Sequence, residues 1–363
     1  MKHWGVESKQ SHQGAIEPLC SFLCITYNHA PYIEGCLHGF LEQETSFPFE
    51  IIIHDDCSTD GTDEIIKAYA ARYPKIIKPL YEEENQYSKG DKARPFFGIM
   101  SRMAAKYIAF CEGDDYWDDP KKIETQVRFL ESNPDFVLCY HRCHTIDSSG
   151  IVENDDGSLH RDAIPRALQR LEVLVTTRTV CYRNVVDYLE PDILYYSHKI
   201  LNGDTFLWTL LGQHGGAKYL ADIRPAYYRL HAGGVWSSLS SPLQFRIHAK
   251  SFFYMSEYHY KCGNEELSSF LLCLSLQNLC FASSSRLTQK EVDSVIKTLL
   301  DKRGGGGPAA CWLPFFTYQT TCAIATTACA FHHHFYAREA KKMERETSAA
   351  VIIRTITPAL RAA

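Results

Sequence analysis

Two apolar runs of this chain end directly in carboxylates, and no other feature of the sequence constrains the fold as much. FEIIIHDD occupies residues 49–56 and KYIAFCEGDD occupies residues 106–115, while an uncharged run, LCSFLCITY, precedes them at residues 19–27. Continuous apolar runs of this length are typical of strands that are buried on both faces of a parallel sheet. Open α/β sheets bind ligands at the carboxyl ends of such strands, so the acids are predicted to lie at the ligand-binding edge.

Helical patterns separate these runs. Residues 31–41 begin with a proline and repeat their apolar side chains at helical spacing, and residues 63–73 carry a second apolar stripe. A third helix is predicted over residues 120–132, followed by the strand FVLCYHR at residues 136–142. The alternation predicts an α/β domain with a mostly parallel sheet flanked by helices.

The strand signals cease after about residue 241, where helical patterns take over. We therefore expect four regions: a flexible N-terminal tail at 1–17, the α/β domain at 18–240, a helical C-terminal region at 241–303, and a glycine linker with a further helix and a basic tail at 304–363. Residues 309–331 carry no charge, and basic residues follow up to Arg345. Two readings remain open for 309–345, a packing helix or a peripheral contact with the plasma membrane.

Charge and cysteine usage indicate the compartment and the partners. The net charge of -5 is unfavourable for binding a polyanion, so nucleic acid is not an expected partner. The 14 cysteines form no CxxC pairs, and several lie inside apolar runs, as buried thiols do in a reducing compartment. The N-terminus has no apolar segment of signal-peptide length. We therefore expect a cytoplasmic protein, or one at the inner face of the plasma membrane.

The acids at 112–115 predict a cation site. The carboxylates of Glu112, Asp114 and Asp115 repel one another unless a positive charge neutralises them, and a hard divalent ion would do so. Gly113 lets a large ligand approach the backbone. Mg²⁺ and Mn²⁺ commonly bridge such acids to phosphate oxygens, so one of these two ions is the expected cofactor.

Five motifs of the chain resemble those of family 2 glycosyltransferases with the GT-A fold, of the bacterial surface-polysaccharide type. They occur in the family's order between about Pro18 and Ser241. The motifs are ITYNH at 25–29, DDCSTDGT at 55–62, EGDDYW at 112–117, NGDTFLW at 202–208 and YRLHAGGV at 228–235. Glu112 departs from the family pattern, which usually has aspartate there. TRTVCYR at 177–183 is a weaker match to the family's acceptor-side segment, and we assign it no role.

The resemblance implies a donor site at the strand ends. Thr26, Asn28 and Asp56 would hold the nucleotide, with Asp56 accepting hydrogen bonds from the base. A carboxylate can read the N–H edge of a uracil-like ring, whereas phosphate would repel it. Glu112 and Asp114 would lie beside the donor diphosphate.

The resemblance also implies a metal site and a catalytic base. Asp114, Asp115 and His231 would surround a Mn²⁺ or Mg²⁺ ion on the diphosphate, and Asp204 would take the proton from the acceptor hydroxyl.

The implied reaction inverts the anomeric centre. The expected donor is a nucleotide-diphosphate sugar, with UDP as the nucleotide, and the expected acceptor is a saccharide or a lipid-linked saccharide in polysaccharide or cell-envelope biosynthesis. Two alternatives remain: a non-catalytic module that binds nucleotide sugars or glycans on the same fold, and a nucleotidyltransferase. A nucleotidyltransferase normally has a glycine-rich basic loop after the first strand, and residues 25–31 lack one.

Overall fold

The computed structural model describes residues 17–89, 94–153 and 160–283. The chain divides into two compact units, Met1–Ser238 and Leu239–Ala363. The predicted segments at 1–16 and 284–363, including the uncharged run at 309–331, lie outside the described residues.

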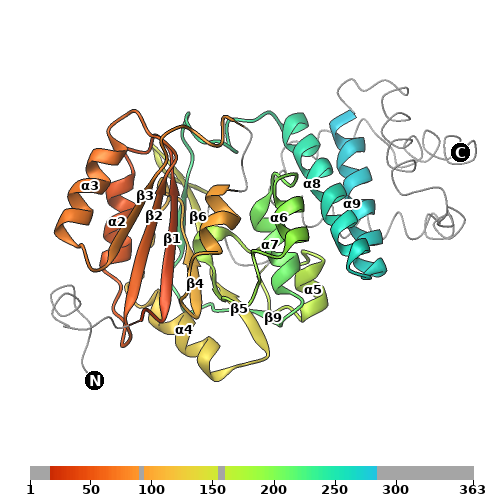
Figure 1. The fold of residues 1–363 in the computed structure, drawn as a ribbon, viewed down its shortest axis with the longest axis horizontal. Helices are drawn as coiled ribbons and strands as arrows, with labels where there is room; N and C mark the ends of the chain where they lie inside the picture. Colours follow the sequence, from red (N-terminus) through yellow and green to blue (C-terminus); the bar gives the residue numbers. More distant parts are fainter. Residues whose placement is uncertain (1–16, 90–93, 154–159, 284–363) are drawn as a thin grey trace, which may run out of the picture. The chain divides into compact units, whose positions relative to one another are not determined.

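The first unit is built on a seven-stranded sheet with the order β3-β2-β1-β4-β8-β5-β9 (Figure 1). The strands are β1 (Cys20–Thr26), β2 (Phe49–Asp55), β3 (Ile77–Tyr81), β4 (Tyr107–Phe110), β5 (Phe136–Tyr140), β8 (Cys181–Arg183) and β9 (Gly216–Tyr219). Strand β1 is parallel to β2 and β4, β2 is parallel to β3, and β5 is parallel to β9. Only β8 runs antiparallel to its neighbours, β4 and β5. This mostly parallel sheet confirms the predicted α/β class.

The apolar faces of the helices build the core against this sheet. Helices α2 (Ile33–Leu41) and α3 (Thr62–Arg72) lie beside β1, β2 and β3 in Figure 1, and α4 (Lys122–Ser132) precedes β5. Phe22 of β1 stacks on Phe49 of β2, with ring centroids 4.4 Å apart. Trp117 packs edge-on against Phe22, at 5.4 Å. The buried rings thus tie the segment that follows β4 to the core, which fixes the position of the acids just before it.

A second sheet has three strands, in the order β10-β6-β7. Its strands are β6 (Cys143–Asp147), β7 (Gly150–Glu153) and β10 (Ala226–Arg229), and β10 is parallel to β6. Tyr116 and Tyr227 form an antiparallel bridge with stacked rings 4.6 Å apart. This bridge brings β10 alongside the acids that follow β4, although about 110 residues separate them in the sequence.

Short helices complete the first unit. They are α5 (Pro165–Gln169), α6 (Pro191–Ser197), α7 (Gly203–Leu211), the π-helix η1 (Arg94–Gly98) and the 3₁₀ turn η2 (Thr177–Thr179). Only Val180 separates turn η2 from β8, which lies between β4 and β5 in the sheet.

The described part of the second unit, which ends at Ser283, contains two helices, α8 (Ser241–Lys261) and α9 (Glu265–Ser283), in agreement with the predicted helical region. Gly263 joins them in a left-handed conformation, with φ at 78°, which glycine adopts without steric cost. Phe252, Met255 and Leu271 are among the buried side chains of this helical pair. Within the described part of the chain, no helix is long and apolar enough to cross a membrane.

Candidate active site

The loops after β1 and β2 are fastened to each other by hydrogen bonds. Asn28, which has a positive φ of 55°, accepts a hydrogen bond from the Thr59 backbone N–H at 2.8 Å. Its own N–H donates to Ser58 Oγ at 2.8 Å, and Ala30 N–H donates to Asp60 at 3.0 Å. Asparagine tolerates the left-handed conformation, so Asn28 can turn the chain sharply at the strand end. The two predicted motifs therefore form one rigid edge.

Asp56 lies at this edge, but the chain itself engages both of its carboxylate oxygens. They accept hydrogen bonds from the backbone N–H groups of Gln86, at 2.7 Å, and Tyr87, at 3.0 Å. Only 3% of Asp56 is exposed. Its predicted contact with the nucleotide base stays a prediction, while its contact with residues 86–87 is a feature of this structure.

The ends of β1 and β4 approach each other so closely that only glycine fits at position 113. A Cβ atom there would lie 2.7 Å from Thr26 Oγ1, and Gly113 N–H donates to the Ile25 carbonyl at 3.0 Å. Among the described residues, buried Thr26 Oγ1 and Glu112 Oε2 have no hydrogen-bond partner. Buried polar atoms are normally paired, so two unpaired oxygens mark this strand edge as a candidate ligand site.

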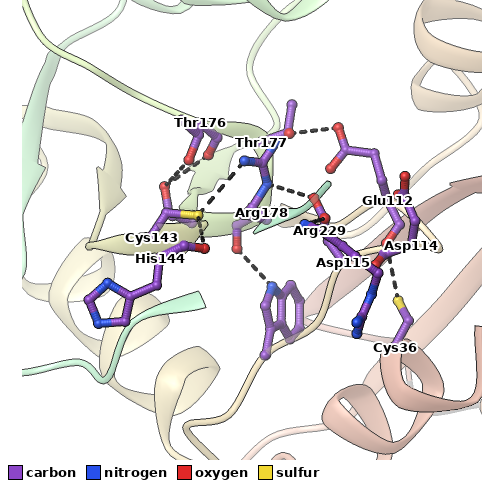
Figure 2. Close-up of polar contacts among 12 residues, drawn as sticks. Cys36, Glu112, Asp114, Asp115, Cys143, His144, Thr176, Thr177, Arg178 and Arg229 are labelled. Atoms are coloured by element: carbon purple, nitrogen blue, oxygen red, sulfur yellow. Dashed lines mark hydrogen bonds and ion pairs between the residues drawn. The ribbon is translucent and has the colours of Figure 1, made fainter. Parts of the chain in front are cut away.

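The three predicted acids have three different partners, and Figure 2 shows those of Glu112 and Asp115. Glu112 accepts a hydrogen bond from Thr177 Oγ1 at 2.7 Å, and Asp115 forms an ion pair with Arg178, Oδ2 to Nε, at 2.7 Å. Asp114 Oδ2 instead lies 3.0 Å from Nε2 of His231. Only Asp114 is therefore free of the η2 turn and directed toward histidines.

His29, Asp114 and His231 form a group that fits a metal ion. One ligand atom from each residue lies within 4.8 Å of the other two, and His29 Nε2 is 3.6 Å from Asp114 Oδ2. Burial lowers the pKa of His29, against the opposing charge of Asp114. A neutral imidazole with a free lone pair is the form that binds a metal. Asp115, predicted to lie beside the metal, is not a member of this group.

His29 was not predicted as a site residue. It stands in the ITYNH motif directly after Asn28, so its position at the strand end was the available signal. Two observations in the structure add it to the group: its ring is edge-on to that of His231, with centroids 5.8 Å apart, and its side chain is 12% exposed.

Arg178 was also missed, and it is the cation at the centre of the acids. Burial by itself would lower the pKa of its guanidinium, but Asp115 and Glu112 raise that pKa well above its ordinary value. Burial raises the pKa of Glu112, and Arg178 and Thr177 oppose the shift. Arg178 therefore stays charged and compensates carboxylates that a buried site could not hold otherwise.

Asp204 lies in the first turn of α7, where the helix N-terminus favours a negative charge. Burial raises its pKa above the usual value of 3.8, and the charge of Arg178 acts in the opposite direction. The same arginine thus influences both the acids after β4 and the predicted base. The assignment of Asp204 as the base stays a prediction.

Comparisons with known proteins agree with this architecture. Residues 21–186 match the family model described as glycosyl transferase family 2. An uncharacterized protein of Mycobacterium tuberculosis is 37% identical over 222 residues, 60% of each chain. TuaG of Bacillus subtilis, a putative teichuronic acid biosynthesis glycosyltransferase, is 29% identical over 59% of this chain and 80% of its own. The chain thus matches less than two thirds of the length of the mycobacterial relative.

A solved structure has the same fold. Residues 1–349 of Staphylococcus aureus TarS, crystallised in complex with UDP, superpose with a TM-score of 0.54 at 17% identity, over 77% of this chain and 78% of that one.

Proposed function

Because residues 21–186 belong to glycosyl transferase family 2, we propose that this protein transfers a sugar from a nucleotide-diphosphate donor to a hydroxyl group of a saccharide or lipid-linked saccharide. The observation that best supports this proposal is the arrangement of the acids after β4. Thr177 and Arg178 engage Glu112 and Asp115, so Asp114 alone meets two histidines at the ligand-binding edge.

Asp114, His231 and His29 would hold the divalent ion, which would neutralise the departing diphosphate. The donor set supports this assignment because it combines one carboxylate with two imidazoles. Mg²⁺ prefers an all-oxygen environment, whereas imidazole nitrogen suits transition metals. Between the two expected ions, the site therefore favours Mn²⁺.

The donor nucleotide would lie along the ends of β1 and β2, against Thr26, Asn28 and Asp56. The unpaired oxygens of Thr26 and Glu112 support a polar ligand there. UDP is the proposed nucleotide, since the similar fold of TarS was solved with UDP.

Asp204 would act as the general base for a single displacement that inverts the anomeric carbon. Its carboxylate would take the proton of the acceptor hydroxyl while the diphosphate leaves from the opposite face. Burial raises the pKa of Asp204, which strengthens it as a base. Substitution of its carboxylate by an amide would remove the proton acceptor and leave the shape.

The proposed setting is the assembly of a surface polysaccharide or another cell-envelope glycan, at the cytoplasmic face of the membrane. The names of two similar proteins support this setting. TuaG is named for teichuronic acid biosynthesis, and TarS is named a poly(ribitol-phosphate) beta-N-acetylglucosaminyltransferase.

A donor-hydrolysis assay tests the proposal. The full chain is incubated with a panel of nucleotide sugars and either Mn²⁺ or Mg²⁺, and the released nucleoside diphosphate is measured. Asp204→Asn and Asp114→Ala should abolish the release, whereas Asp118→Asn, in the same loop but 48% exposed, should not. Release of pyrophosphate would favour a nucleotidyltransferase, and binding without release would favour a non-catalytic module.

A further inference from the structure

Arg178 is in no catalytic motif, yet it links the parts of the site that are most distant in the sequence. We propose that Arg178 is a positioning residue: its ion pair with Asp115 holds β10 and the following residues so that His231 stays beside Asp114. The metal-related part of this proposal rests on the function proposed above.

The Asp115 carboxylate joins three segments at once. Oδ2 lies 2.7 Å from Arg178 Nε of η2, and Oδ1 accepts a hydrogen bond from the Arg229 backbone N–H at 2.8 Å. Asp115 itself follows β4 and is 1% exposed. Since Arg229 ends β10 and His231 is two residues further on, the position of Asp115 sets the position of His231.

Side chains on β10 reinforce this connection. The Arg178 guanidinium lies over the ring of Tyr228, 4.2 Å from its centroid. The neighbouring Arg229 donates from Nε to the Asp114 carbonyl at 3.0 Å. Of these two consecutive residues of β10, Tyr228 packs against Arg178 of η2 and Arg229 binds the segment of acids, which leaves the strand little freedom to shift its register.

Arg178 is itself held in place by a buried scaffold. Its carbonyl accepts a hydrogen bond from Trp117 Nε1 at 2.7 Å, and the Thr179 carbonyl accepts one from Gln126 Nε2 at 2.9 Å. Gln126 Oε1 accepts from Lys122 Nζ at 2.6 Å, and that ammonium lies 4.1 Å from the centre of the Trp117 ring. The turn that carries Arg178 is therefore anchored to α4 independently of the metal group.

Removing the guanidinium while keeping Asp115 would leave a buried carboxylate without its cation. Without that contact the carboxylate is no longer held between Arg178 and Arg229, and its displacement weakens its hold on the Arg229 amide. His231 would then be less well positioned beside Asp114. The affinity of the site for the metal would fall, and the displacement of His231 would be the only cause. A role for Asp115 as a direct metal ligand predicts a different result, because a ligand would matter whether or not His231 is present.

A double-mutant cycle separates the two roles. Mn²⁺ binding to the full chain is measured by electron paramagnetic resonance for the wild type, Arg178→Gln, His231→Ala and the double variant. Loss of a residue that supports a metal ligand typically weakens binding 10- to 100-fold, so we expect roughly tenfold for Arg178→Gln alone. In the His231→Ala background, we expect the same substitution to change the affinity less than about twofold.

Two further variants calibrate the cycle. Arg178→Lys keeps a positive charge and should recover part of the affinity. Arg128→Gln removes the same charge from an exposed ion pair with Glu124 and should leave Mn²⁺ binding unchanged. An equal loss of affinity in both backgrounds would overturn the positioning role.

Amide hydrogen exchange of Arg229, measured by NMR without metal, tests the same connection independently. Exchange should be faster in Arg178→Gln than in the wild type and unchanged in Arg128→Gln. An unchanged Arg229 amide in Arg178→Gln would refute the proposal, whatever the metal does. A wild-type protein that binds no Mn²⁺ would instead contradict the metal part of the proposed function, and the exchange rates would still decide whether Arg178 holds β10.

Discussion

The two sides of the candidate site are held together in different ways. On the side proposed for the nucleotide, called the nucleotide side below, the loops after β1 and β2 are joined by bonds such as Asn28 to Thr59 and Asp56 to Gln86, between residues about 30 positions apart. On the opposite side, Glu112 meets Thr177 and Asp114 meets His231, which are 65 and 117 positions apart. The first side is fixed by local motifs, and the second depends on side-chain contacts between distant segments.

This difference indicates where substitutions should act on structure and where on chemistry. Backbone N–H groups engage Asp56, so its replacement should disturb the fold of the edge. The side chains of His29, Asp114 and His231 have no comparable role in holding the loops together. Their substitution should therefore disturb metal binding more than the fold. The predictions below test this division.

Asp114→Ala should have the largest effect. It removes the carboxylate that both histidines face, so we expect loss of Mn²⁺ binding and a fall in diphosphate release of roughly 1000-fold, equivalent to several kcal/mol of transition-state stabilisation. The thermal midpoint should change little, because Asp114 is not tied to η2. Measurable Mn²⁺ affinity in this variant would show that the metal site lies elsewhere in the protein.

Asp204→Asn should reduce kcat by roughly 100- to 10,000-fold, the usual contribution of a general base. Unlike Asp114→Ala, it should leave Mn²⁺ binding intact, because Asp204 is outside the histidine group. The measurement is steady-state transfer, with Mn²⁺ affinity as the control. If Asp204→Asn lost Mn²⁺ binding as well as rate, Asp204 would not act as a base separate from the metal site at Asp114.

The pH dependence of the wild type provides a check without mutation. A base acts only when deprotonated, so kcat/KM should fall about tenfold per pH unit as the pH drops below the pKa of Asp204. Burial raises that pKa above 3.8, so the acid limb should lie at a higher pH than an exposed aspartate would give. An acid limb at or below pH 4 would argue against Asp204 as the base.

His29→Ala should weaken Mn²⁺ binding more than the roughly tenfold expected when only a supporting residue is lost. His29 is part of the loop on the nucleotide side, but it contacts Asp114 on the other side. The Mn²⁺ affinity of the His29→Ala variant therefore shows with which side His29 acts. His38→Ala, in the neighbouring helix α2, is a matched control. Unchanged Mn²⁺ affinity in His29→Ala would leave Asp114 and His231 as the protein ligands.

Asp56→Asn should have the smallest effect on catalysis and a clear effect on stability. An amide can accept only one of the two hydrogen bonds from residues 86–87, so we expect a loss of about 1–3 kcal/mol in the free energy of unfolding. If Asp56 also reads the base, KM for the donor should rise at constant kcat. Denaturant unfolding and donor titration distinguish the two contributions.

The sequence predicted the nucleotide side more completely than the other. The runs that became β1, β2 and β4 were apolar and ended in polar motifs, so their position at one edge followed from the rules of parallel sheets. Asp114 and His231, named in advance, do come together. The α/β class and the C-terminal helices were predicted correctly, and residues 21–186 match the model of the family that the motifs resemble.

Other features had no local signal. Strand β8 has three residues and runs antiparallel, which no periodic pattern reveals over so short a length. Arg178 stands in TRTVCYR, whose match to the family's acceptor-side segment was too weak to assign a role, and its contacts with Asp115 and Tyr228 join residues that are distant in the sequence. The resemblance implied that Asp115 lies near the metal, and the structure pairs its carboxylate with Arg178. Its role at the metal stays a prediction.

The double attachment of Asp115 limits how enzymes with this site can be recombined. A chimera that joined the strand-end loops of this chain to the second half of a relative would separate Asp115 from Arg178 and Arg229. The transplanted half would then have to supply new partners for the Asp115 carboxylate, which is buried away from water. We therefore expect working hybrids to inherit all three positions from a single parent.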